Sequence, residues 1–206
     1  MSYKLKKKFN VILARESRMA KSVALQAIKP KPFSVWEVLI PVIFILSFMR
    51  SKEQREIFSQ NLMFTKKMAL EAAFEMLNKE QAKEAVMRRI ASETQRLLSA
   101  VPNGVYSDAI RQKQLKEIDL LIDHYCKLMR AEGGDYVTLV ANAYQTKEKY
   151  AVFQDKLTSA ERAVTQAARE TLGDQTDDQM AARIEAASGK FRRQEVETIF
   201  SPHAQH

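Results

Sequence analysis

The stretch from Tyr136 to Thr171, YVTLVANAYQTKEKYAVFQDKLTSAERAVTQAARET, decides the fold class of this chain. Apolar or small residues recur along it at alternating spacings of three and four over about five heptads. The stripe comprises Tyr136, Val140, Ala143, Thr146, Tyr150, Phe153, Leu157, Ala160, Val164, Ala167 and Thr171. This is the period of an α-helix with one buried face. We therefore predict a helix over 136–171, capped by Asp135 and ended by Gly173.

The same period continues on the N-terminal side of this stretch. Residues 51–101 predict one long helix, or two nearly collinear ones with an interruption around Glu80 and Lys83, ended by the turn at 102–104. A further helix begins after a cap at Ser107 or Asp108 and stops at Gly133-Gly134.

The C-terminal side is less regular. Thr176 to Gln179 reads as a capping box that opens a short helix, which we expect to end at Ser188 before Gly189. Residues 190–206 are expected to be a flexible tail.

The composition agrees with a helical protein. The chain has 206 residues, of which only 5 are glycine and 5 proline, too few for an all-β fold with many turns. Its 46% apolar content excludes a wholly disordered protein. We predict an all-α fold, either an antiparallel helical bundle or an elongated coiled-coil hairpin. The predicted parts are a basic amphipathic arm (1–32), an apolar helix (33–50), the helical bundle (51–189) and the tail (190–206).

The positive charge of the chain is concentrated at its N-terminus. Residues 1–32 hold nine basic side chains and one acid, which accounts for the whole net charge of +8. An amphipathic helix is predicted over 9–28, with an apolar face formed by Phe9, Ile12, Leu13, Met19, Ala20, Val23 and Ala27. We expect Arg15, Arg18 and Lys21 on the opposite face, whereas Glu16 falls inside the apolar one.

The most apolar segment follows the basic arm. Residues 38–49 contain no charged side chain, but twelve helical residues reach only about 18 Å, against a hydrocarbon core of about 30 Å. Pro41 would kink a helix at its middle, and basic residues flank the segment on both sides.

Three interpretations of this segment remain open. It is a re-entrant or interfacial helix, a single membrane span, or a helix buried in protein. On the first two, the basic face binds anionic headgroups and the apolar run enters the acyl region. The expected membrane contacts are Arg15, Arg18, Lys21, Trp36, Val38, Leu39, Ile40, Pro41, Val42, Ile43, Phe44, Ile45, Leu46, Phe48 and Met49.

Candidate chemistry is sparse. There is no phosphate-binding loop, no nucleophile elbow and no Glu-x-x-His pair, so we expect no cofactor and no metal. The densest polar cluster is Asp119, Asp123 and His124, where a solvated helix face is favoured over a metal or catalytic site. His203 and His206 lie in the predicted tail and specify a metal site only poorly.

These observations favour a non-enzymatic, membrane-associated scaffold or adaptor. Its anchor is residues 1–50, and its bundle binds a protein partner or a second copy. A lone cysteine, Cys126, forms no intramolecular disulfide, so the bulk is expected to face the cytoplasm. The first alternative is a soluble structural subunit of a larger helical assembly, with residues 38–49 buried at an interface. A weaker one is nucleic-acid contact through the basic arm.

Overall fold

The computed structural model describes residues 3–27, 51–100, 106–172 and 178–201. Within these ranges the chain forms seven α-helices and no strand, which confirms the all-α prediction. The helices are α1 (Tyr3–Ala27), α2 (Ser51–Lys79), α3 (Lys83–Ala100), α4 (Asp108–Arg130), α5 (Tyr136–Tyr144), α6 (Lys147–Leu172) and α7 (Asp178–Ile199).

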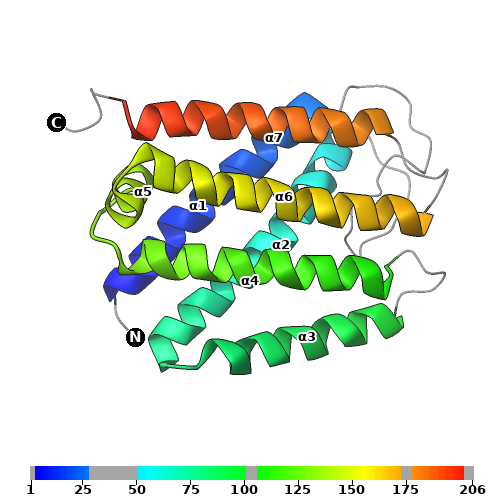
Figure 1. Cartoon of the computed structure of the whole chain (residues 1–206), viewed down its shortest axis with the longest axis horizontal. Coiled ribbons are helices and arrows are strands. Elements are labelled where there is room, and N and C mark those ends of the chain that lie inside the picture. Colours follow the sequence, from blue (N-terminus) through cyan, green and yellow to red (C-terminus); the bar gives the residue numbers. More distant parts are fainter. Residues whose placement is uncertain (1–2, 28–50, 101–105, 173–177, 202–206) are drawn as a thin grey trace.

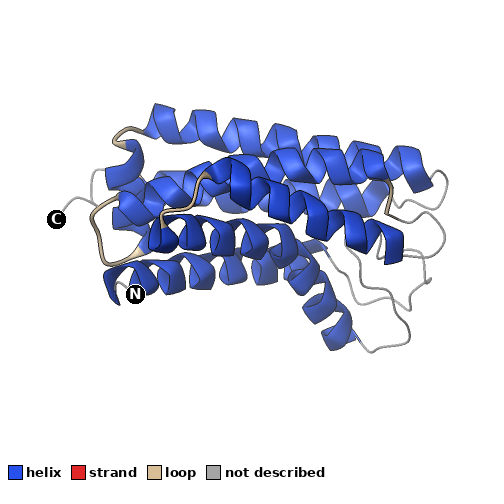
Figure 2. Ribbon diagram, turned by 90° about the horizontal axis from the view of Figure 1, so that it is seen from below, coloured by secondary structure: helices blue, strands red, loops and turns tan. Residues whose placement is uncertain are grey.

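The helices form a two-layer bundle rather than an elongated hairpin (Figures 1 and 2). Helices α3, α4, α6 and α7 lie side by side in one layer, and α1 and α2 cross it obliquely in the other. The short α5 lies at one end. Helix α4 is central, because it contacts α2, α3 and α6, while α1 packs between α2 and α7.

Helices α1 and α2 pack against one another in antiparallel orientation. The contacts along α1, in order, are Phe9 with Phe74 (ring centroids 5.2 Å apart), Glu16 with Lys66, and the cluster around Val23 with Leu62. The residue numbers rise on one helix as they fall on the other. The end of α1 at Ala27 and the start of α2 at Ser51 therefore lie at the same end of the bundle (Figure 1).

The predicted continuity of α2 and α3 is wrong, because the chain turns sharply after Lys79. Glu80 has φ +54°, and the amide of Gln81 donates to the Met76 carbonyl at 3.1 Å. This 6→1 hydrogen bond around a left-handed residue is a Schellman-type helix end. It turns α3 back to run along α4 (Figure 1).

The single helix predicted over 136–171 is also interrupted. Gln145 has φ +67° and its amide donates to the Ala141 carbonyl at 2.8 Å, which ends α5. The Thr146 hydroxyl then accepts from the amide of Lys149 at 3.3 Å and starts α6. The predicted start is confirmed, because Asp135 caps α5 through the amide of Thr138.

The predicted start of α4 is confirmed, but the predicted end of α7 is wrong. Ser107 caps α4 by accepting from the amide of Ile110 at 3.3 Å, as predicted. The predicted end of the last helix at Gly189 is wrong, since α7 continues through it to Ile199. Arg192 and Ile199 are buried, so packing against the bundle holds the segment that was expected to be a tail. The capping box at Thr176 lies outside the described residues.

One main hydrophobic core joins most helices. Its largest fully buried side chains include Ile12 of α1, Leu70 of α2, Tyr125 of α4 and Tyr150 of α6. Helix α1 is thus part of the core and covers it with its apolar face.

Candidate functional site

A buried ion network begins on α1 with two adjacent residues, Arg15 and Glu16. Their exposed fractions are only 6% and 2%. Arg15 donates from Nη1 to Glu16 Oε1 at 2.8 Å and from Nε to Glu195 Oε1 at 2.6 Å, and its Nη2 pairs with the second Glu195 oxygen. Tyr150 donates its hydroxyl proton to Glu195 at 2.9 Å. The guanidinium therefore joins α1 to α7 inside the protein.

The position of Arg15 corrects one prediction. At about 100° per residue, Arg15 is only about 40° from Met19, so it borders the apolar face rather than lying opposite to it. Arg18 and Lys21 are exposed, as expected. Glu16 falls inside the apolar face, also as expected, and pairs there with cations.

Lys66 of α2 extends the network toward α6 and α7. Its Nζ lies 3.3 Å from Glu16 Oε2 and 4.0 Å from Glu161 Oε1. Arg192 donates from Nη2 to Glu161 at 2.5 Å and from Nη1 to Thr158 at 2.9 Å. Burial alone would raise the pKa of Glu16, but Arg15 and Lys66 outweigh it and lower the pKa to about 2. The network is thus ionised at neutral pH.

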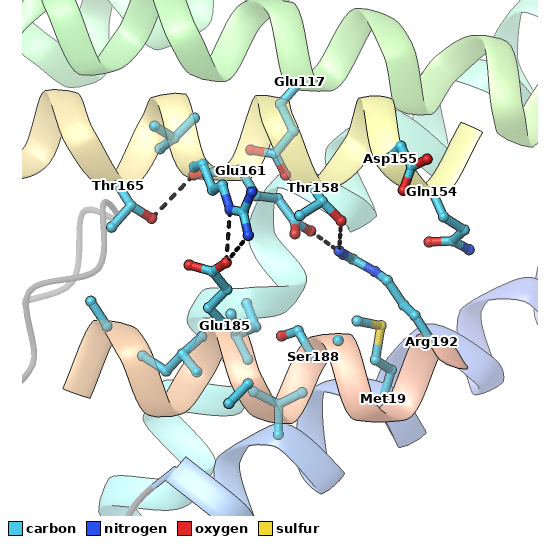
Figure 3. A pocket seen from close by; sticks show the side chains of 18 of the residues that line it. Met19, Glu117, Gln154, Asp155, Thr158, Glu161, Thr165, Glu185, Ser188 and Arg192 are labelled. Carbon is cyan, nitrogen blue, oxygen red and sulfur yellow. Dashed lines mark hydrogen bonds and ion pairs between the residues drawn. The ribbon is translucent and has the colours of Figure 1, made fainter. Parts of the chain in front are cut away.

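A cavity of about 1020 Å³ lies between α6 and α7 and ends on this network (Figure 3). Helices α1, α2 and α4 also contribute to its wall. Side chains bridge the two helices, since Arg192 reaches Glu161 and Arg162 pairs with Glu185. The apolar part of the lining is formed by Met19, Ala20, Val23, Leu62, Val164, Ala168, Ala181 and Ile184. The volume is that of a small-molecule site.

Glu117 of α4 is the unusual titratable group of the cavity. It is 7% exposed, and its side chain points from α4 toward Glu161 and Thr158 (Figure 3). Within the described ranges, its carboxyl has no hydrogen bond and no ion pair. Burial and the Glu161 carboxylate raise its pKa to about 8, although Lys66 and Arg192 oppose the shift. A carboxyl with a raised pKa in a cavity is typical of functional sites.

Gln154 of α6 adds a second unpartnered acceptor. It is 7% exposed, and its Oε1 atom is buried without a hydrogen-bond donor. It lies one turn before Thr158 on the face of α6 that lines the cavity (Figure 3). Unsatisfied buried polar atoms are rare in folded proteins, so the Gln154 Oε1 atom needs a physical explanation.

The cluster Asp119, Asp123 and His124 does not form one site. Asp119 is half-buried and Asp123 is exposed, and both pair with the Lys83 ammonium, at 2.8 and 2.7 Å. His124 is instead buried, with Nδ1 2.7 Å from the Tyr144 hydroxyl. The prediction that these side chains lie on a solvated helix face is therefore confirmed for the two aspartates and wrong for His124. Across the part of the chain that the structure describes, no three His, Cys, Asp or Glu side chains are grouped as metal ligands.

The neutral imidazole of His124 predicts a loss of stability in acid. Burial lowers its pKa from 6.5 to about 3. Between these two pH values the imidazole is protonated in the unfolded chain and neutral in the folded chain. The contribution of His124 is complete above about pH 6.5 and is lost as the pH falls toward 3. Replacing both His124 and Tyr144 by Phe should flatten the pH dependence of unfolding between pH 6.5 and 5 by up to about 1.4 kcal/mol per pH unit.

Urea unfolding at several pH values measures this effect. Tyr144→Phe alone keeps the imidazole and should keep the pH dependence, although it removes the hydrogen bond. An unchanged slope in the double variant would contradict the assignment of a buried neutral imidazole.

The remaining predicted membrane contacts, Trp36 and residues 38–49, lie outside the described residues. None of the helices that the structure does describe is both long and apolar enough to cross a bilayer. His203 and His206 are likewise outside the described residues.

The cavity site was not predicted from the sequence, although a signal for it exists. Glu117 shares a helix face with Ile110 and Leu121, as Glu16 does with Ile12 and Met19, and a carboxylate on an apolar stripe indicates a buried charge. Comparison with protein-family models, curated proteins and solved structures finds no match for this chain.

Proposed function

We propose that this chain is a non-enzymatic, membrane-associated helical protein with its bulk facing the cytoplasm. Residues 38–49 attach it to a lipid surface, and the bundle of α1–α7 binds a protein partner or a second copy. One observation carries the proposal: a run without any charged side chain connects two helices whose adjoining ends lie at the same end of the bundle. An apolar run placed in this way can enter a membrane beside the bundle without disrupting it.

The packing of α1 on α2 supports the re-entrant or interfacial alternative over a single span. The two helices share one core through contacts such as Phe9–Phe74 and the Glu16–Lys66 ion pair. A single crossing between residues 28 and 50 would put α1 and α2 on opposite sides of the membrane. That arrangement would break the core, so we propose that both helices remain on one side.

The exposed charges of α1 support headgroup contact near the attachment point. Arg18 and Lys21 are exposed within about three turns of Ala27, beside the 60% exposed side chain of Leu25. The lysines at 4, 6 and 7 lie at the far end of the helix. Lys8 is engaged there, since its Nζ donates to the carbonyls of Met129 and Ala131 at 3.1 and 2.6 Å. We therefore assign headgroup contact to Arg18 and Lys21.

Vesicle flotation with an anionic lipid mixture tests the proposal. The full chain should float, and a variant lacking residues 38–49 should remain in the soluble fraction with its helical circular dichroism intact. Arg18→Gln with Lys21→Gln should weaken binding about 30-fold at low salt, since each basic side chain near the surface contributes about 1 kcal/mol. The matched control, Lys6→Gln with Lys7→Gln, should bind nearly as the parent does. A full chain that stays unbound, with a deletion variant that aggregates, would favour the buried subunit interface instead.

Cysteine labelling tests the topology. Cys126 is buried and burial raises its thiol pKa, so it is a poor reporter and is replaced by serine. Asn10→Cys on α1 and Gln112→Cys on α4 are exposed positions on either side of the apolar run in sequence. Both should react with a membrane-impermeant maleimide from the same side of sealed vesicles. Reaction from opposite sides would rule out the shared orientation.

A further inference from the structure

The cavity between α6 and α7 contains two acceptor groups that nothing in the described structure satisfies. Glu117 and Gln154 are each more than nine-tenths buried, and the Gln154 Oε1 atom is buried without a hydrogen-bond partner. Burying a polar group without a partner costs free energy, and a ligand that supplies donors would recover it. At Glu117 and Gln154, the missing partners are therefore hydrogen-bond donors.

The charges of the buried network favour a cationic ligand beside Glu117. In the buried network Arg15, Lys66 and Arg192 face the carboxylates of Glu16, Glu161 and Glu195. These three cations and three anions balance, so an ionised Glu117 would add one negative charge without a counter-ion. Nearer to solvent, Arg162 pairs with Glu185 and Lys147 with Glu197. Asp155, Arg169 and Arg193 also line the cavity, but they are not among the charges that shift the pKa of Glu117. A ligand ammonium beside Glu117 would supply the absent counter-ion.

The apolar part of the cavity indicates the rest of the ligand. Met19 and Val23 of α1, Leu62 of α2 and Ile184 of α7 line it in the same space as the polar end. A ligand with an aliphatic part would bury it there, at a gain of about 25 cal/mol per Å² of apolar surface.

We propose that this cavity is a binding site for an amphipathic primary amine. The ligand ammonium pairs with the Glu117 carboxylate. Its aliphatic part packs against Met19, Val23 and Leu62. Amine binding at this site does not depend on membrane attachment, so its test is independent of the test of the proposed function.

The proton balance follows from the state of Glu117. Its pKa is raised to about 8 in the free protein, because burial and Glu161 of α6 outweigh Lys66 of α2 and Arg192 of α7. An ammonium that pairs with the carboxylate therefore displaces the carboxyl proton to solvent at pH 7. The affinity should increase as the pH rises from 6 to 8 and level off above it, as long as the amine stays protonated.

Isothermal titration of the full chain with hexylamine, hexanol and hexanoate tests the proposal. Hexylamine should bind to one site at least about tenfold more tightly than either of the others, which corresponds to about 1.4 kcal/mol. Titration at pH 7 in two buffers of different ionisation enthalpy should show release of nearly one proton per bound amine.

Two variants separate a specific site from general apolar binding. Glu117→Gln should reduce the amine affinity to that of hexanol and abolish the proton release. The amide resembles the neutral carboxyl in shape, so the variant should fold. Glu71→Gln, an exposed change on α2, should bind as the parent does. Equal binding of the three probes, no binding of any, or an unchanged amine affinity in Glu117→Gln would each overturn the proposal.

Discussion

Replacement of Arg15 by methionine should lower the free energy of unfolding by about 3–5 kcal/mol at pH 7, the usual cost of removing one partner from a buried ion pair. The methionine fills much of the same space, but Glu195 loses its cation and Glu16 keeps only Lys66. Two carboxylates would then be underpaired in the protein interior, where charge is costly. Chemical denaturation monitored by circular dichroism measures the loss.

The pH dependence of this loss distinguishes charge from packing. The folded-state pKa of Glu16 is lowered to about 2, so its contribution is present above its ordinary pKa near 4.5 and is lost as the pH falls through 2. The difference between the parent and Arg15→Met should therefore shrink as the carboxyls take up protons below pH 4.5. Arg18→Met, on the exposed face of the same helix, should change stability by less than about 0.5 kcal/mol. A difference that is constant with pH would show that lost packing causes the effect.

Replacement of Ile12 by alanine should cost about 2–5 kcal/mol, because this side chain is fully buried and its removal leaves a cavity in the main core. The result tests whether α1 is part of the bundle or a separable basic arm. Leu25→Ala on the same helix is the matched control, since Leu25 is 60% exposed and its truncation should cost little. Similar small effects for both variants would indicate that α1 does not contribute to the core.

The sequence predicted which faces are buried better than it predicted where helices end. The stripe of 136–171 is buried at Tyr136, Val140, Tyr150 and Phe153, on both sides of the break at Gln145. Apolar residues at alternating spacings of three and four indicate which helix face is buried. The turn at Gln145 keeps the same face toward the core, so the spacing continues across it. Gln145 takes a positive φ without being glycine or asparagine, so local sequence gave no sign of this turn. The interruption of the stripe around Glu80 and Lys83 did mark the break between α2 and α3, but not the sharp angle between them.

The candidate site was harder to predict, because its members come from distant helices. Lys66, Glu117, Glu161 and Arg192 belong to α2, α4, α6 and α7. Glu117 alone lies on a recognisable apolar stripe, and the other three read as surface charges on amphipathic helices. Only tertiary packing brings them together. The same applies to α7, where Gly189 is a stop signal in isolation but burial of Arg192 and Ile199 continues the helix.

The ion pair between Arg15 and Glu195 joins residues 180 positions apart. During synthesis α1 emerges before α7, which carries Glu195. Until then the guanidinium of Arg15 has Glu16 as its partner but not the bidentate carboxylate of α7. The network is therefore complete only once α7 packs on the bundle, and a chain cut before α7 keeps an incompletely paired cation and an uncovered face of α1. Only a chain that includes α7 supplies Glu195 and Arg192 to the network.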